Sequence, residues 1–240
     1  MFLFSYTPGS RSSKLLAEKA GLKRIKHRNS KFKMNPRKKV VNWGAAKLPD
    51  KVWGCDVINR HVLTDKLAAF NRIGHKDWLV PWADTQDTAK EWLNNGNVVV
   101  ARTMLRAHSG RGIVLCGYGH GDLVQAPLFT RYVKKKYEYR VHITRLGNFI
   151  VDWKARVLDH PNPNWQIRNH GNGFRYLSCG DYPLPIINAA KLALEAMKYD
   201  FGAVDILWNE HEGSAYVCEV NAAPGLENTR TLEFYCNARS

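Results

Sequence analysis

Four segments of the chain carry the apolar spacing or the end signals of helices. The first begins at a serine N-cap, Ser10 or Ser12, and runs to a glycine stop. Residues 62–74 and 184–200 repeat apolar side chains every three or four positions, which is typical of amphipathic helices. Residues 83–96 begin with Asp and Thr and end at a glycine. The sequence therefore predicts four helices spread along the chain.

Between these helices, short apolar or alternating runs predict strands. Two runs near the N-terminus flank a basic loop, and with the first helix they make a small β-α-β-like unit that ends near residue 50. The segment 160–173 is rich in turn residues and is predicted to be a long loop. The chain is predicted to end in a pair of strands. The predicted strands are residues 1–6, 22–28, 38–44, 97–104, 111–117, 125–133, 137–143, 149–157, 202–209 and 214–221.

The composition is that of a folded protein. The chain has 240 residues, 45% of them apolar, and eight tryptophans, which suffices for one large domain or two small ones. No apolar run approaches the roughly 18 residues of a membrane helix, and the N-terminus lacks the charged region of a signal peptide. The five scattered cysteines have no zinc spacing, which indicates reduced thiols. We therefore expect a cytoplasmic protein with no membrane partner.

The net charge of +15 is concentrated near the N-terminus. Residues 11–39 contain twelve Lys or Arg and one acid, whereas the remainder is nearly balanced. Such a block is typical of a surface that binds nucleic acid or another polyanion, and equally of a solvated face that aids solubility. Phe32 is its single aromatic residue, so a stacking platform for single-stranded nucleic acid is not supported. Both interpretations stay open.

Four predicted strands carry charged side chains on one face, because side chains alternate across a strand. One wet face and one buried face is the ordinary interpretation for the first two of these strands. Asp205 and Glu219, however, lie in largely apolar strands, where a carboxylate is costly unless it is paired or binds a metal. The shared faces are Glu138, Arg140 and His142; Asp152, Lys154 and Arg156; Glu219 and Asn221; and Asp205 alone.

Two features indicate chemistry with phosphates. Asp205, Glu219 and the Asn221 amide form a set of hard oxygen ligands suited to Mg²⁺, which usually shares its site with substrate phosphates. The loop at 108–112 contains small residues that let backbone N–H groups approach an anion, and Arg111 adds a charge. Alone, this loop is weak support for a phosphate site.

The order of motifs resembles the ATP-grasp superfamily, in the branch of carboxylate–amine ligases related to ribosomal-protein glutamate ligases and glutathione synthetases. The most specific motifs are Asp-Phe-Gly-x-x-Asp at 200–205 and Glu-Val-Asn-x-x-Pro-Gly at 219–225. The resemblance covers roughly residues 55–235. It implies an α+β protein in which two α+β subdomains clasp ATP beside a small N-terminal α/β unit, with boundaries at 1–55, 56–133 and 134–240.

The resemblance also implies roles for individual residues. Arg102 stands where the family usually has a second phosphate-binding lysine, and Arg131 stands where an acid is common. Asn169 falls near an asparagine on the substrate or metal side. The implied ATP-binding residues are Lys66, Arg102, Ser109, Gly110, Arg111, Gly112, Arg131, Tyr132, Val133 and Glu138. The implied ligands of one or two Mg²⁺ ions, with Mn²⁺ as the alternative, are Asp205, Glu219 and Asn221. The implied catalytic residues are Arg140, Lys154 and Arg156.

The implied activity is an ATP-dependent ligase that forms an amide through an acyl phosphate and releases ADP and phosphate. Two alternatives are a kinase of the same fold and a nucleic-acid-binding protein with a degenerate nucleotide site. The expected partners are a carboxylate and an amine, with residues 11–39 available for a polyanionic acceptor or a nucleic acid. The chain is short for this family, which suggests a trimmed, phage-like version of the kind that mobile elements carry.

Overall fold

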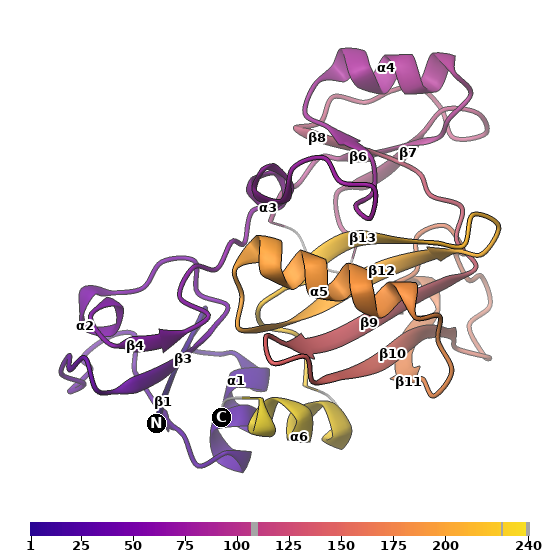
Figure 1. Ribbon diagram of the computed structural model, residues 1–240. Coiled ribbons are helices and arrows are strands. Elements are labelled where there is room, and N and C mark those ends of the chain that lie inside the picture. Colours follow the sequence, from indigo (N-terminus) through magenta and orange to yellow (C-terminus); the bar gives the residue numbers. More distant parts are fainter. Residues whose placement is uncertain (107–109, 227, 239–240) are drawn as a thin grey trace.

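The computed structural model describes residues 1–106, 110–226 and 228–238 and contains three β-sheets in the described part of the chain (Figure 1). We call them the N-terminal sheet, the small sheet and the large sheet. The mixed α and β architecture is the one that the sequence predicts. No helix in the described ranges is both long and apolar enough to cross a membrane.

The N-terminal sheet is parallel, with strand order β2-β1-β3-β4. Alternation along β1 sends Leu3 toward α1 and Phe4 toward the opposite face, which α2 and the 25–38 loop cover. The Ser10 hydroxyl caps α1 by accepting from the Ser13 N–H. The elements are β1 (Phe2–Ser5), α1 (Arg11–Lys19), β2 (Lys23–Arg24), β3 (Lys39–Trp43), α2 (Asp50–Trp53) and β4 (Asp56–Ile58).

The small sheet is antiparallel, with strand order β5-β8-β6-β7. Helix α4 packs on one of its faces and buries Ala89 against Val99, Ala101 and Phe129. Helix α3 precedes the sheet and begins at the Asp65 N-cap. The elements are α3 (Lys66–Ile73), β5 (Trp82–Ala83), α4 (Gln86–Asn94), β6 (Val99–Arg102), β7 (Ile113–Cys116) and β8 (Leu128–Arg131).

The large sheet is antiparallel, with strand order β11-β10-β9-β12-β13. Helix α5 covers one face with a continuous apolar side (Figure 1). The charged side chains of the sheet line the cavity on the opposite face. That arrangement leaves one face of the sheet free to form a site. The elements are β9 (Tyr137–Thr144), β10 (Phe149–Arg156), a 3₁₀ turn (His170–Asn172), β11 (Phe174–Ser178), α5 (Pro185–Met197), β12 (Phe201–Asn209) and β13 (Ser214–Asn221).

A C-terminal helix, α6 (Thr229–Asn237), joins the N-terminal unit to the large sheet. It lies beside α1 in Figure 1, and its Tyr235 ring packs edge-on against Trp43 and contacts Phe201. Farther along this junction, Gly44 adopts a positive φ of 80° and lies against Ala223. The N-terminal unit is therefore fixed against the segment that follows β13.

Several elements differ from the sequence predictions, and α2, β4 and β5 were not predicted at all. The second predicted strand shrinks to Lys23–Arg24, because the basic residues beyond it cross the face of the sheet as a loop. No element was predicted for the segment that forms β11, because this strand is stabilised by its pairing with β10 and not by a clear pattern of its own. The sequence predicted that the chain ends in a pair of strands, whereas the structure continues into helix α6. The N-cap of this helix, Asn228, follows a run of turn residues and was therefore not read as the start of a helix.

Gly44→Ala tests the junction between the N-terminal unit and the large sheet. A Cβ there would lie 2.6 Å from the Ala223 Cβ, in addition to the strain of a positive φ. We expect a loss of about 2–4 kcal/mol in unfolding free energy by urea denaturation, against about 1–2 kcal/mol for Gly21→Ala, which has a positive φ but open space around it. Equal losses for the two variants would contradict the packed junction.

Candidate active site

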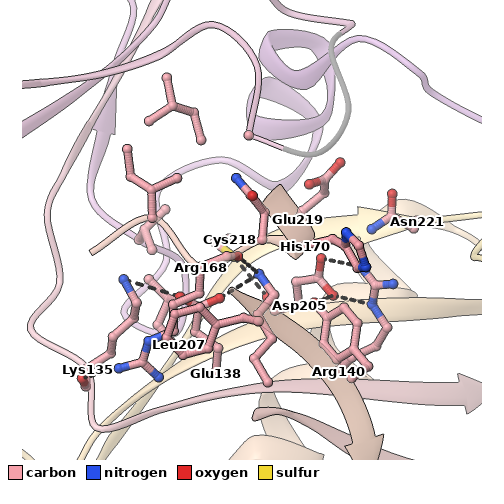
Figure 2. A pocket seen from close by; sticks show the side chains of 18 of the residues that line it. Lys135, Glu138, Arg140, Arg168, His170, Asp205, Leu207, Cys218, Glu219 and Asn221 are labelled. Carbon is pink, nitrogen blue, oxygen red and sulfur yellow. Dashed lines mark hydrogen bonds and ion pairs between the residues drawn. The ribbon is translucent and has the colours of Figure 1, made fainter. Parts of the chain in front are cut away.

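A cavity of about 700 Å³ lies between the small and large sheets. The small sheet contributes aliphatic side chains at one end, including Val100, Ile113 and Leu115. Strands β9, β10, β12 and β13 form a charged floor, shown from close by in Figure 2. The far end is lined by the 223–225 turn and the first turn of α6. The cavity thus has an apolar end, a charged middle and a polar far end.

The centre of the floor is an ion pair between neighbouring strands. Arg140 on β9 lies opposite Asp205 on β12, and its Nε and Nη2 donate to the two carboxylate oxygens at 2.6 and 2.7 Å. The Tyr176 ring stacks on the guanidinium at 4.1 Å, and its hydroxyl donates to Asp205 at 3.3 Å. This two-point pair fixes both side chains in the plane of the floor.

The pair also sets the charge state of its members. Burial opposes ionisation of Asp205, but the charge and hydrogen bonds of Arg140 outweigh it and hold the pKa of that carboxyl below its usual range. Burial likewise lowers the pKa of Arg140, and the Asp205 carboxylate more than offsets it, so the pKa of the guanidinium stays well above its ordinary value. Both groups are therefore charged at neutral pH.

The second carboxylate of the floor is paired as well. Glu219 on β13 lies directly across from Asp205 on β12, and its Oε1 is 3.2 Å from the Lys66 ammonium at the start of α3. Asn221 follows two residues later on the same strand, and its side chain lies near those of Glu219 and His170 in Figure 2. The structure thus brings Lys66 and the two carboxylates together from three separate parts of the sequence.

Glu138 is the third acid of the floor and meets two lysines. Its oxygens lie 2.7 Å from Lys154 on β10 and 3.3 Å from Lys135 in the preceding linker. Burial lowers the pKa of Lys135, and the nearby Arg168 guanidinium adds to that effect, while Glu138 opposes it. Arg168 itself is buried and donates to the Lys135 and Lys136 carbonyls. These bonds tie the 165–170 loop to the floor.

Arg102 projects from the end of β6 into the cavity. Among the described residues its Nε is one of few buried side-chain donors that lack a hydrogen-bond partner. A buried donor without a partner costs free energy, so a ligand that supplies an acceptor is favoured here. Together with Lys66, Arg102 offers two cations beside the charged floor.

Beneath the far end, a buried hydrogen-bonded chain anchors α6. The Tyr235 hydroxyl lies 2.9 Å from His142 Nδ1, His142 Nε2 lies 3.3 Å from Asp152, and Arg230 lies 3.2 Å from the other Asp152 oxygen. Burial lowers the pKa of His142, the charge of Arg140 adds to this, and Asp152 opposes it. His142 is therefore neutral at pH 7, donating to Asp152 and accepting from Tyr235.

The Cys218 thiol lines the cavity but is a poor nucleophile. Burial and then the Asp205 and Glu138 carboxylates raise the pKa of the thiol to about 12. Its Sγ donates to the Asp205 carbonyl at 3.4 Å. The site therefore depends on carboxylates, cations and amides.

Most residues singled out in the sequence converge on this cavity. Lys66 is brought to its floor through the contact with Glu219. Arg111, Gly112 and Arg156 are not among the described residues that line the cavity, and Ser109 lies outside the described residues. The cavity-lining ones are Gly110, Arg102, Arg131, Tyr132, Val133, Glu138, Arg140, Lys154, Asn169, Asp205, Glu219 and Asn221.

Sequence reasoning assigned no role to four other residues of the site. Lys135 and Arg168 are held by the linker and the long loop, whose conformations carry no periodic signal. Tyr176 lies on β11, which was not predicted as a strand. Asp152 was placed on the correct face by strand alternation, but its partner Arg230 belongs to the unpredicted helix.

No family model matches the sequence, and no curated protein matches it. Solved structures match nearly the whole chain. The ATP-grasp ligase PsnB, in complex with a minimal precursor, Mg and ADP, superposes with a TM-score of 0.63 at 11% identity over 99% of this chain and 96% of that one. The chain has the ATP-grasp fold.

Two further ATP-grasp structures agree. The macrocyclase MdnC of Microcystis aeruginosa, bound to its precursor peptide MdnA, gives a TM-score of 0.57 at 12% identity over 98% of each chain. A RimK domain ATP-grasp protein from Sphaerobacter thermophilus gives 0.59 at 14% identity over 100% of this chain and 96% of that one. The predicted fold is thereby confirmed, and at these identities the likeness concerns the fold alone.

The pH dependence of stability tests the neutral state of His142. Its pKa in the folded chain lies below the ordinary 6.5, so below that pH the unfolded chain binds the additional proton. The unfolding free energy should therefore fall as the pH is lowered through 6.5. The slope from this group is at most about 1.4 kcal/mol per pH unit. The His142→Gln variant has no titrating group at this position, so the dependence of its unfolding free energy on pH, measured by urea denaturation, should lose this contribution. An unchanged dependence would contradict a neutral His142.

Proposed function

We propose that this chain is an ATP-dependent ligase that joins a carboxylate to an amine through an acyl phosphate. The observation that carries the proposal is the cavity floor, where two adjacent carboxylates, an amide and several cations converge between the two sheets of an ATP-grasp fold. Such a set can hold several anions together, which is the main difficulty in phosphorylating a carboxylate with ATP.

The apolar end supports a purine. Val100, Ile113 and Leu115 provide aliphatic side chains, and residues 131–133 at the end of β8 and in the linker after it line the same cavity. Arg131 and Tyr132 donate their N–H groups to the Pro81 and Val98 carbonyls. The Val133 N–H donates to no backbone carbonyl among the described residues, so we assign it to the edge of the base. In this proposal Lys66, Arg102 and the loop at Gly110 face the phosphates, and Glu138 faces the ribose hydroxyls.

The donor set supports Mg²⁺. Asp205, Glu219 and Asn221 supply oxygens from two adjacent strands, although no group of three or more His, Cys, Asp and Glu side chains suited to a metal occurs in the described ranges. The proposed set has two carboxylates and an amide, which suits an ion that completes its shell with phosphate oxygens and water. When bound, Mg²⁺ would neutralise charge on the phosphates, with Mn²⁺ as its substitute.

The proposed reaction has two steps. An oxygen of the substrate carboxylate attacks the γ-phosphorus and ADP leaves. The neutral amine then attacks the acyl carbon, the bond from that carbon to the phosphorylated oxygen breaks, and the departing phosphate takes up the proton that the nitrogen loses. Arg140 and Lys154 lie on the floor, and we assign them the stabilisation of the phosphoryl oxygens and of the oxyanion. Arg156 is exposed at the end of β10, so we assign it no contact with the reacting atoms. The buried Thr231 hydroxyl has no hydrogen-bond partner in the described part of the chain, which supports a polar substrate group at the far end.

Product analysis tests the ligase directly. Incubation with ATP, Mg²⁺ and cell extract should yield condensed products by mass spectrometry, together with ADP, and Glu219→Ala should abolish both. Phosphorylated products without any amide would identify the alternative, a kinase of the same fold. Full turnover by Glu219→Ala would contradict the metal assignment.

Arg102 tests the phosphate assignment. Arg102→Gln should weaken ATP binding about ten-fold in calorimetric titration with Mg²⁺, because it removes a charge-assisted contact. Arg102→Lys keeps the charge and should retain most of the affinity, though without a two-point contact. Arg145→Gln, at the exposed turn after β9, is the matched control and should bind ATP as the wild type does. Unchanged affinity in Arg102→Gln would show that the phosphates lie elsewhere.

A further inference from the structure

The proposed ligase site does not use the most unusual feature of the sequence, its N-terminal positive charge. We call the Lys and Arg side chains of residues 11–39 the cationic band. It begins on the outer side of α1, crosses the edge strand β2 and continues along the loop over the opposite face of the N-terminal sheet. All of its members except Lys38 are exposed.

The band has almost no compensating charge within the chain. Among the described residues its single ion pair joins Lys19 to Glu233 of α6, at 3.9 Å. Arg24 and Lys38 donate to backbone carbonyls, which leaves their charge uncompensated. Like charges gathered in this way repel one another and destabilise the compact state. A charged edge strand does discourage aggregation, but two residues of β2 would suffice for that.

The band lies close to the far end of the cavity. Helix α1 packs against α6, and Lys19 reaches Glu233. Thr231, two residues earlier on α6, lines the cavity. Nearby, Gly44 of the N-terminal unit lies against Ala223, which lines the same end. These contacts place the α1 end of the band beside two elements, α6 and the 223–225 turn, that line the far end of the cavity.

We propose that the cationic band docks an acidic polypeptide, which delivers a side chain or terminus to the far end of the cavity for ligation. The proposal rests on the proposed ligase function, since it names the class of substrate. Carboxylates spaced along an extended peptide match cations distributed over a helix, a strand and a loop. Docking outside the cavity leaves the reacting group to be selected by the floor.

A peptide fits the band better than a nucleic acid does. Phe32 is the single aromatic residue of the block, and its ring packs edge-on against Phe2 with the Lys38 ammonium 4.9 Å from its centre. No aromatic face is thus offered for base stacking, which supplies much of the affinity for single strands. An acidic peptide requires only the cations and an extended path.

Fluorescence anisotropy with a labelled peptide of about ten glutamates tests the docking, and a glutamine peptide of equal length controls for charge. The wild type should bind the glutamate peptide, and more weakly as salt is raised. Lys23→Gln/Lys26→Gln/Lys31→Gln should weaken binding about ten-fold, because three exposed charges are lost. Lys76→Gln/Lys90→Gln/Lys191→Gln removes the same charge elsewhere and should bind as the wild type does.

Three results would overturn the proposal: equal weakening in both triple variants, equal binding of the glutamine peptide, or tighter binding of an oligonucleotide of matched charge. The last result would assign the band to nucleic acid instead. The Glu219→Ala variant should bind the glutamate peptide with the affinity of the wild type, since Glu219 lies outside the band. Peptide binding without ADP release or amide product would remove the ligase function and leave the docking surface standing, so the two failures can be told apart.

Discussion

The site depends on the buried ion pair between Arg140 and Asp205. Two charges in a sheet floor are stable only as a pair, and removal of one partner from such a pair typically costs about 3–5 kcal/mol. The pair fixes the register of β9 against β12 through side chains as well as backbone, and Tyr176 on β11 stacks over it. Three of the five strands of the large sheet, β9, β11 and β12, thus contribute a side chain to one charged centre. Its geometry defines the positions of Glu138, Lys154 and Glu219 around it.

The negative charges of the floor are already paired with cations before any ligand binds. Glu219 is matched by Lys66, Asp205 by Arg140, and Glu138 by Lys135 and Lys154. In the proposed reaction these ion pairs open. The cations then contact the phosphate and acyl oxygens, and the Asp205 and Glu219 carboxylates contact the metal. Because these charges already lie together on the floor, none has to be brought in from solvent when the phosphoryl group is bound. The buried chain from Tyr235 to Asp152 holds α6 at the same floor and couples the N-terminal unit to it.

The sequence predicts the parts of the molecule that are periodic. Alternation placed Glu138, Arg140 and His142 on one face and Asp152 with Lys154 on another, and the structure turns these faces toward one cavity. The sequence could not predict which side chains become partners through tertiary contacts. Lys66 meets Glu219 across more than half of the chain, and Arg230 reaches Asp152 from a helix whose cap was hidden by a Pro-Gly turn. Arg156 shares the predicted face of Lys154 yet ends outside the cavity, because the strand leaves the floor at its last residue.

A crystal structure with Mg²⁺ and a non-hydrolysable ATP analogue tests the central claim most directly, namely that the paired carboxylates of the floor are a nucleotide–metal site. The account predicts the purine beside Val100 and Leu115 and the phosphates between Lys66 and Arg102. It predicts the ion at about 2.1 Å from oxygens of Asp205, Glu219 and Asn221, with the Lys66–Glu219 contact opened. A nucleotide bound elsewhere, or one in this cavity with both carboxylates still paired to their cations and no ion between them, would contradict it.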